Sequence, residues 1–413
     1  MQFIGLDFGT SNSLAALFTN DEMQFVNFPD GGISNPTILY FPAKSKQHRI
    51  GTDAVESYLH DMEEGGIGGR LMLSIKTLLP EANFDYTIVA GHGRLSAEDL
   101  AAKFLSSLKG MAEQQFAAQF DGVVLGRPVQ FSDFAIARLE KAAKLAGFKE
   151  VVFWLEPVAA ALAYERTTSR DELVCVVDLG GGTSDICVIE TSPTRSLSPD
   201  RIGDIKATGG VNKAGDELSS QIMKEKLAVR FGAGSSYKSL GKTLPFPAHI
   251  IYRLSEWHRI NMLNESGDKS IISEIIPYSD RAEDVERLFN LIDHRYGFAL
   301  FQAIDAAKRN LSTQDQTLIK FSPLDLREPI TVSEFENLIA ETEQKIKKSI
   351  SDSLLAASVT PADIDRVILT GGTSQVPRIS RMVTEIFGAE KILRPDFFSS
   401  VATGLGYVAS TLG

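Results

Sequence analysis

A short phosphate-loop pattern occurs twice in this chain and limits its fold more than any other feature. One copy runs from Phe3 to Ser13 and the other from Val174 to Asp185. Each has an apolar strand-forming segment ending in an aspartate, a glycine-rich turn with small hydroxyl residues, and a second apolar segment. Glycines allow close backbone approach, and consecutive N–H groups in such a turn bind anions. Two facing hairpins would hold one polyphosphate, so the repeat predicts a two-lobed nucleotide enzyme.

The two copies differ in how strongly they predict a phosphate-binding loop. An aspartate at a strand end, as at Asp7 and Asp178, can hold the waters of a Mg²⁺ ion. The first copy alone is also compatible with a plain β-turn, because Asp-x-Gly turns are common. The second copy has three adjacent glycines, Gly180–Gly182, which weaken a strand and therefore indicate close approach of a phosphate.

Length and charge bound the class of protein. At roughly 150 residues per domain, 413 residues predict two or three domains. A formal net charge of −11 argues against a general nucleic-acid or anionic-membrane surface. No apolar run reaches the ~20 residues that span a bilayer, and the N-terminus begins with a strand rather than a signal sequence. We expect a cytoplasmic protein that binds neither nucleic acid nor membrane.

The two cysteines, Cys175 and Cys187, lie in predicted apolar strands. Buried, unpaired thiols in a reducing compartment are the favoured interpretation, and a disulfide between flanking strands is the alternative. No Cys/His spacing suggests a metal site.

Along the chain, strands alternate with helices, and antiparallel hairpins are added at the start of each predicted lobe. This pattern predicts two α/β lobes with mixed sheets. The helical patterns are 53–62, 96–119, 133–147, 158–165, 215–231, 247–263, 281–311, 333–357, 377–388 and 397–412. The segment Gly232–Pro247 is rich in Gly, Ser, Lys and Pro, and predicts a mobile loop.

Several polar residues outside the repeat have both a structural and a functional interpretation. Glu156, before Pro157, would be a helix-capping anion or a carboxylate that positions water. Lys76, among apolar residues, would reach solvent or point at a γ-phosphate. Asp305, Lys308 and Ser312 share a helical spacing that suits either a solvated ion-paired face or a nucleoside site.

Six motifs in the same order give the chain a resemblance to the ATPase domain of DnaK-type heat-shock chaperones, and in particular to their short YegD-type homologues. This family belongs to the actin/sugar-kinase/heat-shock ATPase superfamily. The motifs are Ile4–Ser13, Ser74–Lys76, Glu156–Tyr164, Asp178–Asp185, Ala307–Ser312 and Leu369–Pro377.

The resemblance implies an α/β, actin-like ATPase fold: two lobes, each a mixed β-sheet flanked by helices, from a duplicated ribonuclease-H-like core. We expect lobe I at 1–168, with 390–413 returning to it. Lobe II would be 169–389, with an enlarged helical segment at 228–312. ATP or ADP with Mg²⁺, and with K⁺ as an accompanying ion, would be the ligands.

Site residues carried over from the resemblance fall into three groups. Asp7 and Asp178 would hold metal-bound waters. Lys76, Glu156, Asp185 and Thr183 would be the catalytic group. The nucleotide would be bound by Gly9, Thr10, Ser11, Asn12, Gly180, Gly181, Gly182, Thr183, Asp305, Lys308, Arg309, Ser312, Gly371, Gly372 and Gln375.

The chain also departs from the family pattern. Gln375 stands where these chaperones usually have an arginine that packs on adenine. The segment 228–280 is expected to be an added element and a candidate partner surface. No segment resembles the peptide-binding β-sandwich, so a peptide-capture cycle does not follow from this sequence.

The function that the resemblance implies is slow ATP hydrolysis coupled to lobe closure, which a protein partner, client or nucleotide-exchange factor would read. Two alternatives stay open at the level of the sequence. One is a small-molecule kinase of the sugar-kinase type, and the other is an ATP-regulated, actin-like scaffold.

Overall fold

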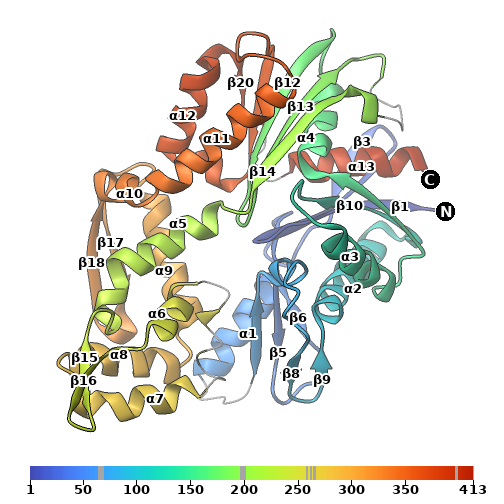
Figure 1. Ribbon diagram of the computed structural model, residues 1–413. Coiled ribbons are helices and arrows are strands. Elements are labelled where there is room, and N and C mark those ends of the chain that lie inside the picture. Colours follow the sequence, from blue (N-terminus) through green and yellow to red (C-terminus); the bar gives the residue numbers. More distant parts are fainter. Residues whose placement is uncertain are drawn as a thin grey trace. The chain divides into compact units, whose positions relative to one another are not determined.

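A computed structural model describes residues 1–63, 69–195, 201–256, 259–260, 263, 267–395 and 399–412 (Figure 1). It divides into two compact units. Unit 1 comprises Met1–Ala214, Lys345–Gln375 and Ile379–Gly413, and unit 2 comprises Gly215–Gln344 and Val376–Arg378. The predicted lobe boundaries, at 168/169 and 389/390, stay a prediction. No helix of the described residues is long and apolar enough to cross a membrane.

Unit 1 contains two mixed sheets that share the same order of five strands, and the first sheet has a sixth strand, β4, in addition. The first has the order β3-β2-β1-β10-β11, with β4 also paired to β2. Its strands are β1 (Phe3–Phe8), β2 (Asn12–Thr19), β3 (Glu22–Phe25), β4 (Asn35–Pro36), β10 (Gly122–Arg127) and β11 (Glu150–Leu155). β1, β2 and β3 are antiparallel neighbours, whereas β10 and β11 add in parallel.

The second sheet repeats this order and these strand directions as β14-β13-β12-β19-β20. Its strands are β12 (Glu172–Leu179), β13 (Ser184–Thr191), β14 (Ile205–Val211), β19 (Arg366–Thr370) and β20 (Ile392–Leu393). β12 to β14 are antiparallel, and β19 and β20 are parallel. The predicted duplicated core and the two mixed sheets are therefore confirmed.

Two helices join the sheets of unit 1. α4 (Glu156–Glu165) and α13 (Ser400–Leu412) share an apolar cluster with β1, β10, β12 and β13 (Figure 1). A Cβ on Gly404 would lie 1.8 Å from the Ala159 carbonyl oxygen, so only glycine permits α13 to pack this closely on α4. The helix that carries Glu156 at its first position is thus fixed between both sheets.

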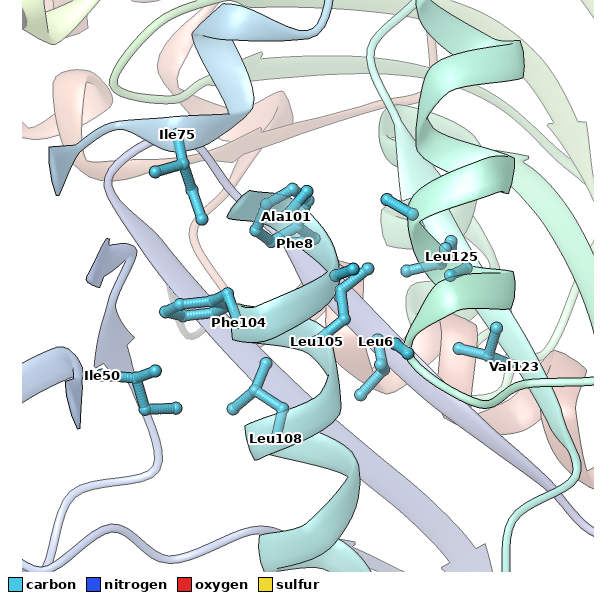
Figure 2. Close-up of a cluster of buried hydrophobic side chains, with 14 of the residues drawn as sticks. Leu6, Phe8, Ile50, Ile75, Ala101, Phe104, Leu105, Leu108, Val123 and Leu125 are labelled. Carbon is cyan, nitrogen blue, oxygen red and sulfur yellow. The ribbon is translucent and has the colours of Figure 1, made fainter. Parts of the chain in front are cut away.

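The other face of the first sheet packs on α2 (Ala97–Phe116) and α3 (Asp133–Leu145). Figure 2 shows Phe104, Leu105 and Leu108 of α2 beside the buried side chains of β1 and β10. α2 begins as predicted, because Ser96 accepts a hydrogen bond from the Asp99 N–H while Asp99 accepts one from Ser96. Ser132 caps α3 in a similar way.

Smaller elements complete unit 1. They are β5 (Ile38–Phe41), β6 (Arg49–Ile50), α1 (Gly51–Glu63), β7 (Arg70–Leu73), the 3₁₀ turn η1 (Ile75–Leu78), β8 (Thr87–Val89), β9 (Gly93–Leu95), η2 (Ile202–Asp204), η8 (Gly372–Gln375), most of α12 (Pro377–Phe387) and η9 (Ala389–Lys391). The sequence also predicts a hairpin loop at 191–203 and a glycine-rich break at 65–69, of which residues 196–200 and 65–68 lie outside the described residues.

Both cysteine thiols are free and buried, as predicted. Cys175 pairs across the ladder with Val188, and Cys187 with Val176. Successive residues of a strand point to opposite faces, so the two thiols lie on opposite faces of the sheet. A disulfide between them is excluded by this register.

Unit 2 is mainly helical. It contains α5 (Gly215–Ile222), the π turn η3 (Met223–Leu227), η4 (Ala228–Phe231), α6 (Ala248–Ser255), α7 (Asp268–Ile275), η6 (Ile276–Tyr278), α8 (Ala282–Asp293), α9 (Gly297–Asn310), η7 (Ser322–Leu324) and α10 (Val332–Leu338), with α11 (Ala340–Ala356) continuing into unit 1. Two antiparallel hairpins, β15/β16 and β17/β18, are also present.

Three predictions for unit 2 are wrong. The expected loop at Gly232–Pro247 contains the hairpin of β15 (Ser236–Ser239) and β16 (Lys242–Pro245). The expected helix at 281–311 is two helices, separated at Arg295 by a left-handed φ of 53°. The helix expected at 247–263 ends at Ser255. β17 (Gln316–Phe321) and β18 (Leu326–Thr331) were not predicted.

Candidate functional site

The first phosphate-type loop connects β1 to β2. Asp7 lies near the end of β1, and the turn follows at Gly9–Ser11. Thr37 braces this turn: its hydroxyl donates to the Gly9 carbonyl at 2.8 Å and its N–H to the Ser11 carbonyl at 2.9 Å. A Cβ on Gly9 would lie 2.1 Å from the Asn12 carbonyl oxygen, so the turn requires glycine there.

The second loop connects β12 to β13 and lies against the first. The Gly180 N–H donates to the Thr183 carbonyl at 3.0 Å, which closes the turn. A Cβ on Gly182 would lie 2.8 Å from the Thr10 hydroxyl oxygen and 2.9 Å from its methyl carbon. The structure therefore brings the two glycine-rich turns side by side within unit 1.

Three aspartates accompany these loops. Asp178 and Asp185 are buried cross-strand partners at the loop ends of β12 and β13, and Asp7 is half-buried. Asp185 Oδ1 accepts a hydrogen bond from the Val129 N–H at 2.6 Å, just after β10. Asp185 therefore links the second sheet to the end of a strand of the first.

Lys76 and Glu156 form a buried ion pair. Lys76 lies in η1, which the chain enters through Ser74 at φ 47°, an unusual conformation for a non-glycine residue. Its ammonium donates to Glu156 Oε1 at 2.5 Å and lies 5.6 Å from the centre of the Phe131 ring. The Lys76 side chain is therefore buried and does not reach solvent. Glu156 does more than cap a helix, because it also pairs with Lys76.

The site concentrates carboxyl groups. Desolvation by burial, with repulsion from Glu156, raises the pKa of Asp7 to about 7 and that of Asp185 to about 7. Burial and the neighbouring carboxylates raise the pKa of Asp178 well above its usual range. Four carboxyl groups share one ammonium, so an added cation would be strongly favoured here.

This donor set fits a magnesium ion held through water. Mg²⁺ keeps several of its waters and takes few direct protein oxygens when a phosphate is also bound. Among the described residues, no three His, Cys, Asp or Glu side chains converge closely enough to enclose a metal directly. Asp7 and Asp178 are the residues that would accept hydrogen bonds from metal-bound waters.

The third glycine motif also contacts the second loop. Gly371 has a φ of 79°, and a Cβ there would lie 2.2 Å from the Leu179 carbonyl oxygen and 2.8 Å from Asp178 Oδ1. The Thr373 hydroxyl donates to the Gly180 carbonyl at 2.7 Å. Gly372 and Gln375 follow in η8 and are exposed. Gly371, Gly372 and Gln375 all belong to unit 1.

The remaining predicted residues lie in unit 2, on α9 and just after it. Lys308 Nζ pairs with Asp305 Oδ1 at 2.9 Å, which agrees with the ion-paired interpretation of this face. Arg309 and Ser312 are exposed, and Ser312 follows the end of the helix. The predicted site residues are thus divided between the two units.

Sequence reasoning missed one residue of this cluster. The Ser219 hydroxyl of α5 lies 2.6 Å from Asp305 Oδ1 and 2.8 Å from Lys308 Nζ. A single serine that is 86 residues away from its partner gives no periodic signal.

One comparison with known proteins bears on this site. A family model described as "Hsp70 protein" matches residues 3–228 and 285–412. The match includes every predicted site residue and leaves out residues 229–284. The unmatched segment contains the β15/β16 hairpin, α6 and α7.

Proposed function

The chain belongs to the Hsp70 family, and on this premise we propose that it hydrolyses ATP to ADP and phosphate. As a member of this family, the chain has the actin-like ATPase fold and is a DnaK-like, nucleotide-binding chaperone domain. The observation that carries the proposal is the buried Lys76–Glu156 ion pair, which lies in a cluster with Asp7, Asp178 and Asp185.

The two adjacent glycine-rich turns would bind the phosphates. Thr10, Ser11 and Asn12 would contribute from the first loop, and Gly180–Thr183 from the second. Backbone N–H groups in such turns offer donors without any rearrangement, which suits the spread of charge in phosphoryl transfer. Bound Mg²⁺, with K⁺ as an accompanying ion, would neutralise developing charge on the phosphates.

Lys76 and Glu156 would orient the attacking water, with Asp185 and Thr183 beside the γ-phosphate. Because Lys76 already donates to Glu156, the two groups hold each other in place before substrate arrives. Phosphoryl transfer depends mainly on such positioning and on charge stabilisation. Removing one charge-stabilising donor from an active site lowers the rate by roughly 10²–10³-fold.

From the family resemblance, the residues proposed to bind the nucleoside are Asp305, Lys308, Arg309, Ser312, Gly371, Gly372 and Gln375. Gln375 carries no positive charge to stack on a purine, so Arg309 would supply the main cation–π contact. We expect a lower affinity for adenine nucleotides than an arginine at position 375 would give.

ATP binding would close the lobes, and a protein partner would recognise that conformational change. The partner would be a client or a nucleotide-exchange factor, and the segment 228–280, nearly all of which the family model leaves unmatched, is its proposed contact surface. Coupling between nucleotide binding and partner binding is reciprocal. A partner that changes the affinity of the protein for ADP must therefore bind the ADP-bound and ATP-bound forms with different affinities. Replacing Leu240 and Gly241 at the β15/β16 turn should weaken partner binding and leave ATP hydrolysis unchanged.

A single assay separates ATP hydrolysis from the kinase alternative. ATP is supplied with Mg²⁺ and K⁺, with and without glucose and glycerol, while phosphate release and ADP formation are both measured. We expect equal amounts of the two products and no effect of the acceptors. ADP formation that depends on an acceptor and releases no phosphate would contradict the proposal in favour of a kinase.

A further inference from the structure

The turn that carries Lys76 is backbone-strained at its start. Ser74 is buried in a left-handed conformation, and the Thr77 hydroxyl donates back to its carbonyl at 2.8 Å. Left-handed non-glycine residues are strained and persist where surrounding contacts fix them. Glu156 restrains the ammonium of Lys76, but the chain after η1 needs a restraint of its own.

Arg138 of α3 supplies that restraint. Its Nη1 lies 3.2 Å from the Leu78 and Leu79 carbonyl oxygens and 3.1 Å from that of Glu81. Its Nη2 lies 3.4 Å from the Phe84 carbonyl oxygen. Nη1 has only two N–H groups, so at least one is shared among the three carbonyls. One guanidinium therefore joins four backbone positions of the segment that follows Lys76.

The guanidinium is itself held in place. Its Nη2 donates to Glu98 Oε2 of α2 at 3.0 Å, and its carbon lies 5.2 Å from the centre of the Phe134 ring. Burial alone would raise the pKa of Glu98, but hydrogen bonds from Arg138 and from the backbone lower it to about 2. The Arg138 side chain is 9% exposed, and α2 and α3 both pack on the first sheet. The restraint on the Lys76 turn is thus anchored in the core of unit 1.

We propose that Arg138 is a positioning residue for Lys76: it fixes the 78–84 segment so that the ammonium of Lys76 meets Glu156 at the reacting phosphate. This inference rests on the proposed role of Lys76 in ATP hydrolysis. Lysine could not replace Arg138 fully, because a single ammonium cannot reproduce the planar fork that spans several carbonyls.

The test is a double-mutant cycle on single-turnover ATP hydrolysis. Arg138→Met keeps an apolar stem against Phe134 and removes every donor. It should slow hydrolysis on the order of 10–100-fold, as displacement of a catalytic group does. In the Lys76→Ala background the same substitution should have almost no further effect, because the group that it positions is gone. A merely structural role would slow both backgrounds equally.

Lys141→Met is the matched control. Lys141 lies three residues further along α3 and contacts the same Glu98 carboxylate at 3.5 Å, but it is exposed and reaches none of the carbonyls of the 78–84 segment. Its substitution should leave hydrolysis unchanged. If Arg138→Met fails to fold, Arg138→Lys keeps the charge beside Glu98 and should show the same dependence on Lys76 with a smaller loss of rate.

Each result has one meaning. Loss of rate that disappears without Lys76 supports the inference. Equal loss in both backgrounds, or none in either, overturns it and leaves the ATPase proposal intact. Normal hydrolysis by Lys76→Ala alone contradicts the proposed role of Lys76, and the role of Arg138 is overturned with it.

Discussion

Burial at this site disfavours the ionised form of individual carboxyl groups. The folded-state pKa of Asp7 is about 7, whereas its ordinary value is 3.8. The folded protein therefore binds a proton more tightly than the unfolded chain does. Stability contributed by this group is complete below about pH 4 and is lost as the pH rises to about 7.

Asp7→Asn should consequently stabilise the nucleotide-free protein at high pH. The expected gain at pH 8 is at most about 4 kcal/mol, the value of about three pKa units, and it should nearly vanish at pH 4. Urea unfolding at both pH values measures the difference. A variant that is no more stable than the wild type at pH 8 would contradict the electrostatic account of this cluster.

Arg309 offers a second test at the scale of one residue. It is exposed on α9, whereas its neighbour Lys308 is engaged with Asp305 and Ser219. Arg309→Ala should weaken ADP binding by roughly 5–30-fold, the loss of about 1–2 kcal/mol of cation–π contact. Titration calorimetry measures this, with Arg327→Ala as an exposed arginine control. Unchanged ADP affinity would remove Arg309 from the nucleoside site.

At the scale of elements, the proposed phosphate site depends on two turns that are close enough to exclude a methyl group. Gly182→Ala places a Cβ 2.8 Å from the Thr10 hydroxyl oxygen. It should destabilise the protein by about 1–3 kcal/mol, as overpacking does. Thr10→Ala in the same chain should restore most of that stability, because it removes the two nearest atoms.

Thermal unfolding of the two single variants and the double variant measures this coupling. Gly110→Ala is the control, because the Cβ it would add in α2 meets nothing within 4 Å apart from its chain neighbours and the backbone of its own helix. It should raise stability by up to about 1 kcal/mol. Additive effects of Gly182→Ala and Thr10→Ala would show that the turns are not in contact.

Local sequence signals predicted most elements but not all of them. The caps of α2 and α3 and the proline near the start of α4 fixed those helices closely. The β15/β16 hairpin was missed because its turn residues, Leu240 and Gly241, lack the Asn-Gly or Asp-Gly signal of a two-residue hairpin. The break at Arg295 was missed because the left-handed residue there is an arginine, and an isolated glycine such as Gly297 is tolerated inside a helical pattern.

The candidate site was predicted where its residues form compact motifs, and those assignments await the experiments above. Contacts between distant segments could not be read from local pattern, as with Ser219 and Asp305. Arg138 did leave a signal. It lies with Ala135, Leu139 and Ala142 on the buried stripe of α3, where an arginine requires a buried partner. That partner, the backbone of the 78–84 segment, follows only from the fold.

For the whole molecule, nucleotide binding should be visible as stability. A ligand that binds only the folded state at about 100 times its Kd adds about 2.7 kcal/mol. Mg²⁺ with ATP should therefore raise the unfolding midpoint of the wild type, and the shift should be much smaller for Asp178→Asn. An equal shift in both proteins would show that Asp178 is not needed for Mg²⁺–ATP binding.

We propose that this member of the Hsp70 family turns over ATP through Lys76. The most direct test is single-turnover hydrolysis of ATP with Mg²⁺ and K⁺, wild type beside Lys76→Ala, with ATP affinity measured on the same samples. We expect the variant to bind ATP with similar affinity and to hydrolyse it about 10²–10³-fold more slowly. Hydrolysis at the wild-type rate would contradict the claim and leave Lys76 with a structural role only.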